Sequence, residues 1–468
     1  MAFFNRRDEL QALQDRWVSK RGELVIVFGR RRVGKSRLIT HWGSQRRHLY
    51  YEATGGSERD HLDDIGREIT RVSGRRVYEE PLASWRGAFA AFEDLLADGP
   101  ILIALDEFQF VARRNAEIGS LVNDLIERHK EDANLRLILA GSDVSFFERD
   151  VVGYGAISYG RRTGSLRLEP FQWSSIEPFV PGWSVEDRIR VWAVYGGMPY
   201  YLDAIDPAND LGENIWRTIL IPDGLLRHEP EFLLAQESRI RERDTYMSAL
   251  RAIAAGHTKL GEIAQRIQRR PGDARSYLET LEDMRLVRRR YPVTRQGGTK
   301  VFYAITDPFL RFWFQFVAPY ESRLQSRESA RRHLHETVLG ALEEFVSRDA
   351  FEEVCHRWAL EHIPEAVEVG RWWGSKRVRT TDGLRTRRYE ADMAAIDAGG
   401  RIVALGSCKW STSLHGTAEL DKLQTVSQML GIDLPPLYFF DRTGFSERLH
   451  EIARERSSVH LITTTDMS

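Results

Sequence analysis

The sequence predicts an α/β fold divided among about three domains. Its 468 residues exceed the roughly 100 to 200 residues of an ordinary domain. Apolar runs at 24–28, 101–105 and 135–140 have the length of buried strands, and helical patterns lie between them. Each run ends in a glycine or an acid, and open parallel sheets bind their ligands at such strand ends. We therefore expect a ligand site at the carboxyl edge of a sheet.

Composition and charge are those of a globular protein. Hydrophobic residues make up 42% of the chain and charged residues 29%, while the net charge of −1 indicates no class of partner. Arginines gather at 266–295 and 376–388, which are candidate nucleic-acid faces. Cys355 and Cys408 are the two cysteines, so we expect no disulfide framework and a reduced, cytoplasmic setting. The sequence shows no signal peptide and no apolar stretch of about 18 residues, so no membrane partner is expected.

The stretch after the first apolar run fills every fixed place of the phosphate-binding pattern G-x-x-x-x-G-K-[ST]. Two glycines in this pattern let backbone N–H groups approach phosphate oxygens closely. The lysine reaches the β and γ groups of a triphosphate, and the serine hydroxyl ligates Mg²⁺. The residues expected around the phosphates are Gly29, Arg30, Arg31, Arg32, Val33, Gly34, Lys35, Ser36 and Arg37.

Further polar residues follow the other two apolar runs. Asp106 is expected to hold Mg²⁺ through water, and Glu107 to orient and deprotonate the attacking water. Ser142 either senses the γ-phosphate or caps the helix that follows. Arg161 and Arg162 precede an alternating strand at 165–168. Either arginine would act on the nucleotide of a neighbouring subunit in a homo-oligomer, or both are simply solvated.

Taken in order, these motifs resemble the archaeal-type AAA ATPases, close to the signal-transducing STAND branch of phosphate-loop NTPases. The resemblance covers about the first 230 residues and includes residues 4–10 and the Gly-Gly-x-Pro-x-Tyr-Leu segment at 196–202. It implies ATP and Mg²⁺ as cofactors, an αβα core at 1–168 and a helical lid at 169–235. Gly196 and Gly197 break a helix before Pro199, as a hinge or only as a corner. The amphipathic helix before the first strand either docks on the core or covers the adenine.

Residues 240–318 contain three helical patterns and two strands, and this order resembles a winged helix-turn-helix. In one interpretation it contacts DNA, and in the other it packs on the lid as a structural lever. The aromatic run at 305–314 resembles the connector of this ATPase family, either as a buried joint or as a base-stacking platform. The arginines expected to contact phosphates are Arg266, Arg269, Arg270, Arg275, Arg288, Arg289, Arg290 and Arg295.

Residues 330–468 resemble an α/β domain of the PD-(D/E)XK nuclease superfamily, which has a restriction-endonuclease-like fold. That pattern places Asp on one strand of a hairpin and (Asp/Glu)-x-Lys on the next, so that carboxylates hold Mg²⁺ at the scissile phosphate. Asp392 and Lys409 fill the first and last places, and Glu352 on the preceding helix is the additional acid. The middle place is Ser407, a poor ligand for Mg²⁺. The acids that could replace it are Glu390 and Glu419.

Two functional hypotheses follow. In the first, the chain is an ATP-hydrolysing switch that acts on DNA, and its nuclease-like domain is degenerate at Ser407. In the second, it is an active ATP-gated, magnesium-dependent DNA nuclease of a defence or mobile-element system. They differ in whether Mg²⁺ binds beside Asp392 and Lys409.

Overall fold

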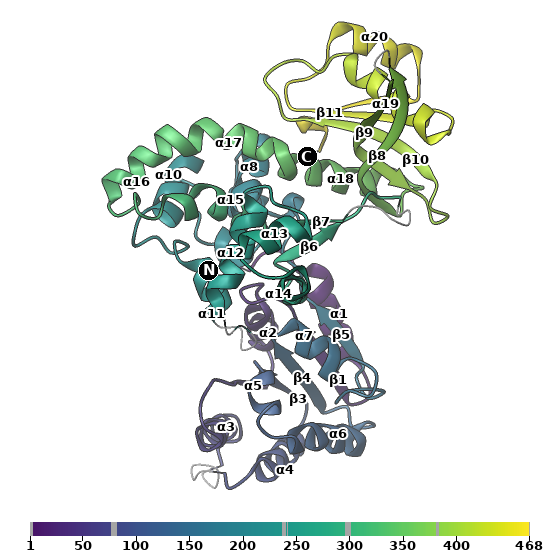
Figure 1. Cartoon of the computed structure of the whole chain (residues 1–468). Coiled ribbons are helices and arrows are strands. Elements are labelled where there is room, and N and C mark those ends of the chain that lie inside the picture. The colour runs from purple at the N-terminus through teal and green to yellow at the C-terminus, as the bar shows by residue number, and fades with distance from the viewer. Residues whose placement is uncertain are drawn as a thin grey trace. The chain divides into compact units, whose positions relative to one another are not determined.

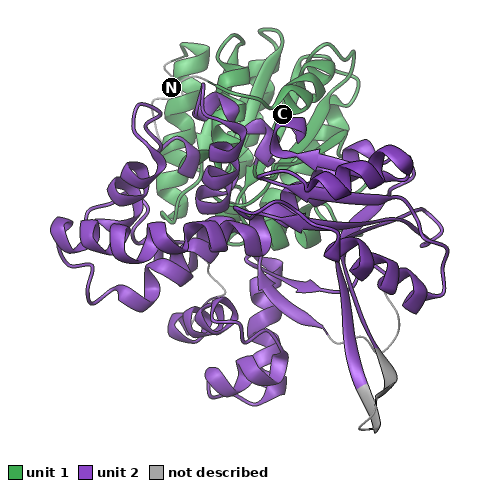
Figure 2. Cartoon of the chain, turned by 90° about the horizontal axis from the view of Figure 1, so that it is seen from above, with its two compact units in different colours: residues 1–170, 198–200 green, residues 171–197, 201–468 purple. Residues whose placement is uncertain are grey.

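The computed structural model describes residues 3–75, 82–235, 240, 242–294, 301–380 and 383–467, apart from the side chains of 376–380 and 383–385. These residues form two compact units (Figure 2). Unit 1 comprises residues 1–170 with 198–200, and unit 2 comprises residues 171–197 with 201–468. The finer predicted boundaries within unit 2 stay predictions. Arg295 and the wing segment at 295–300 lie outside the described residues.

Unit 1 is an α/β domain around one parallel sheet (Figure 1). The strands lie in the order β2-β3-β4-β1-β5, and every neighbouring pair is parallel. Every residue of β1, β3 and β4 is buried, as the continuous apolar runs predicted. The strands are β1 (Glu23–Phe28), β2 (His48–Glu52), β3 (Ile101–Asp106), β4 (Leu135–Gly141) and β5 (Gly164–Arg167). The helices are α1 (Arg7–Trp17), α2 (Lys35–Gly43), α3 (Glu58–Ser73), α4 (Trp85–Leu96), α5 (Gln109–Ala112), α6 (Glu117–His129), α7 (Val144–Phe146) and η2 (Phe147–Val151).

The strand order explains how motifs far apart in sequence come together. β3, β4 and β1 are consecutive neighbours, so their carboxyl ends meet at one edge of the sheet. The Asp-Glu pair lies at the end of β3, Ser142 follows β4, and the phosphate-binding pattern follows β1. The predicted ligand edge therefore forms in unit 1.

Unit 2 begins with helices that lead into a three-helix segment and a β6-β7 hairpin. The first helices are η3 (Trp173–Ser175), η4 (Glu177–Phe179), α8 (Val185–Tyr195), α9 (Pro199–Leu202), α10 (Leu211–Ile215), η5 (Trp216–Leu220) and α11 (Glu229–Ala235). The three-helix segment is α12 (Arg243–Ala254), α13 (Leu260–Arg266) and α14 (Pro271–Asp283). The hairpin pairs β6 (Val287–Arg290) with β7 (Phe302–Ile305) in antiparallel register. α9 begins in the three residues that group with unit 1.

A long helical run follows the hairpin. It comprises α15 (Pro308–Phe316), η6 (Ala318–Tyr320), α16 (Arg327–His333), η7 (Leu334–Val338), α17 (Leu339–Phe345), η8 (Val346–Ala350) and α18 (Phe351–His362). Phe309, Phe312 and Trp313 on α15 are fully buried, and the Trp313 indole donates to the carbonyl of Arg227 at 2.8 Å. The aromatic run therefore serves as a buried joint in this structure. A base-stacking platform would need exposed rings.

The chain ends in a second, mixed sheet in the order β12-β11-β10-β9-β8. β9 is antiparallel to both of its neighbours, β8 and β10, whereas β10, β11 and β12 run parallel to one another. Its elements are β8 (Glu368–Thr380), β9 (Gly383–Ile396), β10 (Ile402–Lys409), α19 (Ala418–Leu430), β11 (Leu437–Asp441), α20 (Glu447–Glu455), β12 (Val459–Thr463) and η9 (Thr464–Met467). The hairpin that carries Asp392 and the strand that carries Lys409 therefore lie side by side, as predicted. Within the described ranges, no helix has both the length and the apolar character needed to cross a bilayer.

Candidate functional site

The loop between β1 and α2 has the backbone that phosphate binding requires. Gly34 caps α2 at φ +92°, a conformation that disfavours any residue with a Cβ. A Cβ at Gly29 would lie 2.3 Å from the carbonyl oxygen of Leu168, so only glycine fits there. Val33 is fully buried under the loop. Arg30, Arg31 and Arg37 are partly exposed around it.

Lys35 lies inside this loop and is only 4% exposed. Its ammonium donates to the carbonyl oxygens of Gly29 at 3.1 Å and Arg30 at 3.2 Å. Burial lowers the pKa of Lys35, and the carboxylates of Glu107 and Asp106 oppose that shift. A buried ammonium held by two carbonyls is chemically suited to exchange them for phosphate oxygens. The residues of the loop therefore fit a bound triphosphate.

Asp106 is the centre of a group of hydrogen bonds beside the phosphate loop. Its Oδ2 accepts from the Ser36 hydroxyl at 2.5 Å and from the Tyr50 hydroxyl at 2.7 Å, and its Oδ1 accepts from the Glu107 backbone at 2.8 Å. Serine hydroxyl and carboxylate oxygens are the ligands that Mg²⁺ uses in phosphate-loop proteins. The structure thus brings together the two residues predicted to hold the metal.

Tyr50 and Glu52 were missed by sequence reasoning. They lie on β2, which pairs with β3 so that Tyr50 is opposite Ala104 and Glu52 is opposite Asp106. Burial raises the pKa of Tyr50 far above its usual range, and Asp106 raises it further. Burial also raises the pKa of Glu52, with Asp106 adding to the shift. The available signal was the period-two spacing of Tyr50 and Glu52, which puts both on one face of the strand.

Glu107 follows β3 in a left-handed backbone conformation at φ +49°. Its Oε2 accepts from the Ser142 hydroxyl at 2.7 Å and from the side-chain amide of Gln109. The cap of α7 is Asp143, whose carboxylate accepts from the Phe146 backbone at 2.9 Å. The interpretation of Ser142 as a helix cap was therefore wrong by one residue. Asp143 fills that role because its side chain reaches the free N–H of the first turn.

The glycine-rich segment predicted in the lid reaches the phosphate loop. The guanidinium of Arg32 stacks 3.8 Å from the Tyr200 ring, and a Cβ at Gly34 would lie 3.8 Å from Pro199. Gly196 ends α8 at φ +65° and ψ −160°, a region that side chains avoid. The predicted helix break is therefore present.

Arg161 and Arg162 lie in the turn before β5. Both backbone N–H groups donate to the carbonyl of Ser158, at 3.1 and 3.0 Å. The Arg162 guanidinium donates to the carbonyl of Val152 at 2.5 Å, whereas Arg161 is exposed. A role for Arg161 on a neighbouring nucleotide stays a prediction.

In the second sheet, Asp392 and Lys409 meet as predicted. The Lys409 ammonium lies 3.4 Å from Asp392 Oδ2 and 3.5 Å from Glu419 Oε1. The Ser407 hydroxyl lies 3.1 Å from Asp392 and 3.3 Å from Glu419. Glu419 thus approaches the position of the missing acid, whereas Glu390 is mostly exposed and lies 4.0 Å from Lys422.

Glu352 is engaged by an arginine, and the charge of Asp392 acts on it without a described hydrogen bond. Its carboxylate accepts from Arg371, and burial raises the pKa of Glu352 to about 7. Within the part of the chain that the structure describes, no group of three or more His, Cys, Asp or Glu side chains could hold a metal ion. The site consists of two carboxylates, Asp392 and Glu419, with Lys409 between them, and we call it the Lys-bridged acid pair.

Several of the arginines expected to contact DNA are engaged by acids of unit 2. Arg288 on β6 pairs with Glu353, and Arg290 pairs with Asp349 at 2.7 Å. Both acids also lie beside Arg311 of α15, which is 2.7 Å from Glu353. The other paired arginines are Arg289, 2.8 Å from Glu282, and Arg269, 2.8 Å from Glu242. Arg266, Arg270 and Arg275 are exposed.

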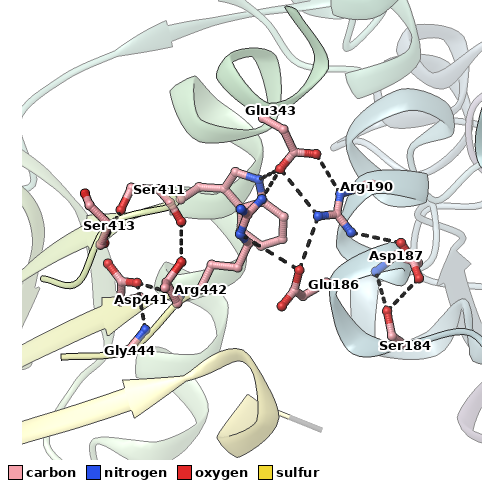
Figure 3. Close-up of polar contacts among 12 residues, drawn as sticks. Ser184, Glu186, Asp187, Arg190, Glu343, Ser411, Ser413, Asp441, Arg442 and Gly444 are labelled. Carbon is pink, nitrogen blue, oxygen red and sulfur yellow. Dashed lines mark hydrogen bonds and ion pairs between the residues drawn. The ribbon is translucent and has the colours of Figure 1, made fainter. Parts of the chain in front are cut away.

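A further cluster fastens α8 to the second sheet (Figure 3). Glu343 on α17 accepts from Arg190 of α8 at 2.8 Å, from the Trp410 indole at 2.8 Å and from Arg442. The guanidinium groups of Arg190 and Arg442 lie 5.4 and 5.2 Å from the Trp410 ring. Trp410 immediately follows Lys409, so this cluster reaches the strand end that carries the Lys-bridged acid pair.

Two family models match this chain. Residues 3–205 match an ATPase domain found predominantly in Archaea. Residues 313–422 match a family described as archaeal and bacterial proteins of unknown function. The predicted archaeal ATPase domain is confirmed. The winged helix and the nuclease fold stay predictions.

Two relatives and one solved structure are similar to this chain over different lengths. An uncharacterized protein of Methanocaldococcus jannaschii is 28% identical over 416 residues, which are 87% of each chain. An uncharacterized ATP-binding protein of the same organism is 49% identical over 37 residues, or 8% of this chain and 63% of that protein. A Walker-type ATPase of Pyrococcus abyssi has a solved structure that matches with a TM-score of 0.51 and 20% identity, over 67% of this chain and 96% of that one. This likeness confirms the Walker-type α/β fold.

Proposed function

We propose that the chain binds ATP with Mg²⁺ at the loop between β1 and α2 and hydrolyses it. The observation that carries this proposal is the 2.5 Å bond between Ser36 and Asp106, the two residues that would hold the metal. The match of residues 3–205 to an archaeal ATPase domain supports it, as does the ATP-binding relative.

Each residue of the site has a role in this proposal. Lys35 would leave its two carbonyl partners and bind the β and γ oxygens. Ser36 would ligate Mg²⁺ directly and Asp106 through water, while Tyr50 keeps the Asp106 carboxylate oriented. Bound Mg²⁺ neutralises charge that develops on the phosphate oxygens. Glu107 would accept the proton of the attacking water.

The test is ATP binding and phosphate release by the full chain. Lys35→Ala should abolish hydrolysis and weaken nucleotide binding, because the ammonium contacts the transferred group. Lys130→Ala is the matched control, since Lys130 is an exposed lysine of the same unit that pairs with Glu127 at 2.8 Å. Hydrolysis that survives in Lys35→Ala would refute the assignment.

A second candidate function is magnesium-dependent cleavage of DNA at the Lys-bridged acid pair. The approach of Glu419 to Ser407 and Lys409 favours it, because a migrated acid would restore the charge that Ser407 lacks. If this acid does not suffice, the domain is a degenerate binding module. Plasmid and single-strand cleavage should be lost in Lys409→Ala and retained in Lys130→Ala. Absence of cleavage in the unmodified chain, with Mg²⁺ or Mn²⁺ and ATP, would refute the candidate.

We also propose DNA as the partner of the three-helix segment. The surface that supports it is the exposed Arg266, Arg270 and Arg275, whereas Arg288 and Arg290 are occupied by acids. Changing the three exposed arginines to Ala should weaken DNA binding. The slope of the logarithm of the binding constant against the logarithm of the salt concentration should fall in magnitude by about 3. An unchanged salt slope would favour the lever interpretation.

A further inference from the structure

Gln109 is a buried amide beside the carboxylate assigned as the catalytic base. It begins α5, two residues after Glu107, and is 4% exposed. Its amide nitrogen donates to Glu107 Oε2 and lies 3.4 Å from the Ser142 hydroxyl. The Ser142 hydroxyl donates to the same Glu107 oxygen at 2.7 Å. Two side chains, one from the start of α5 and one directly after β4, thus hold one carboxylate oxygen.

The Gln109 side chain packs closely against its neighbours. A Cβ at Gly141 would lie 2.1 Å from the Gln109 amide oxygen and 2.5 Å from the Phe147 ring, so the glycine is what admits the amide. The turn before Gln109 is fixed by the Phe108 N–H, which donates to the Ala140 carbonyl at 2.9 Å. Packing this close restricts the rotamers of the Gln109 side chain.

The backbone of Glu107 also indicates a functional constraint. Glu107 is a non-glycine residue in the left-handed region, a strained conformation that persists only where its surroundings enforce it. Such residues cluster at active sites. Here the Glu107 N–H donates to Asp106 Oδ1 at 2.8 Å and the Glu107 carbonyl accepts from the Phe110 N–H at 3.0 Å, so both backbone groups are held.

We propose that Gln109 is a positioning residue for hydrolysis, acting through Glu107 together with Ser142. The two side-chain donors fix Oε2, and Oε1 is then the oxygen presented to the attacking water. Gln109 touches neither nucleotide nor metal in this proposal, so it should affect the chemical step and not binding. The inference rests on the proposed ATPase function.

The experiment compares steady-state hydrolysis and nucleotide binding in Gln109→Met, which keeps the length of the side chain and removes the amide. We expect kcat to fall about 10- to 100-fold, because a small misplacement of a reacting group costs that much, with KM and ATP affinity within about twofold. Ser142→Ala should show the same split. Gln14→Met is the control, since Gln14 of α1 accepts from Arg46 and not from the site.

A double variant separates positioning from a general structural role. In a Glu107→Gln background, Gln109→Met should cause no further loss in single-turnover hydrolysis, because its effect acts through Glu107. An equal further loss there, or an unchanged kcat in the single variant, would overturn the proposal. Nucleotide binding by each variant shows that the site is folded. A chain that binds no ATP even when unmodified would refute the ATPase function itself, which is a distinct result.

Discussion

Glu343 should hold α8 to the second sheet, and Glu343→Gln tests this directly. The change keeps the shape of the side chain but removes the charge that faces Arg190 and Arg442. Both guanidinium groups are largely buried, at 18% and 13% exposed, while Glu343 is 43% exposed. Solvent therefore screens the carboxylate, and each ion pair contributes at most about 1 kcal/mol. Arg190 keeps Asp187 at 2.8 Å as a partner. We expect a loss of about 1 to 2 kcal/mol.

The stability lost in Glu343→Gln should depend on pH and on salt. Burial raises the pKa of Glu343, but its hydrogen bond and charge interaction with Arg190 outweigh burial and hold that pKa below the usual range. A carboxyl whose folded pKa lies below its unfolded value of about 4.3 stabilises the protein above that pH. The contribution is lost as pH falls through the lower, folded value. The difference between Glu343→Gln and the unmodified chain should therefore shrink below about pH 4 and at high salt.

The assay is the rate of thiol labelling in increasing urea. The chain has two cysteines, Cys355 and Cys408, and both are buried in unit 2, so labelling reports opening of that unit. The matched control is Glu344→Gln, because Glu344 is the next residue and pairs only with exposed Arg348 among the contacts described. That control should change stability by less than about 0.5 kcal/mol. Equal effects of the two variants would refute the fastening role of Glu343.

Two further predictions concern carboxylates in each unit. Tyr50→Phe should raise the Mg²⁺ concentration for half-maximal ATPase by about tenfold, because Asp106 loses a 2.7 Å donor; an unchanged Mg²⁺ titration would contradict this. Asp349→Asn should destabilise unit 2 at pH 7. Burial raises the pKa of Asp349, but Arg290 and Arg311 together lower it far below its usual range. That stabilisation is fully present above about pH 4 and declines progressively as pH falls toward the much lower folded pKa, so urea unfolding should show a smaller deficit at pH 3 than at pH 7.

The sequence was most informative where the signal is local. The phosphate-binding pattern and the three apolar strands could be read directly, because glycine spacing and continuous burial leave marks on neighbouring residues. Gln109 left no such mark, and the alternation that puts Tyr50 on the same strand face as Glu52 does not show which residue Tyr50 contacts. Their roles depend on the register of β2 beside β3 and on the position of Gly141.

The sequence shows where the charged residues lie, but it does not show which residues they pair with. Arg288 and Arg290 are two residues apart and share one face of β6, as a strand requires. Their partners lie 65 and 59 residues later, Glu353 on α18 and Asp349 on η8. Similarly, Glu390 and Glu419 were equivalent candidates near Ser407 until the path of α19 placed Glu419 beside Lys409. Tertiary packing determines which acidic residue lies beside which basic residue.

The three residues Met198 to Tyr200 have a consequence for synthesis. They group with unit 1, although the chain on either side of them belongs to unit 2. The residue that stacks on Arg32 is therefore made long after the phosphate loop itself. Domains fold as they emerge from the ribosome at about 5 to 20 residues per second, so the loop would wait roughly ten seconds or more for Tyr200. Until then a nascent unit 1 has its sheet but lacks this neighbour, and nucleotide captured during translation would meet an incomplete site.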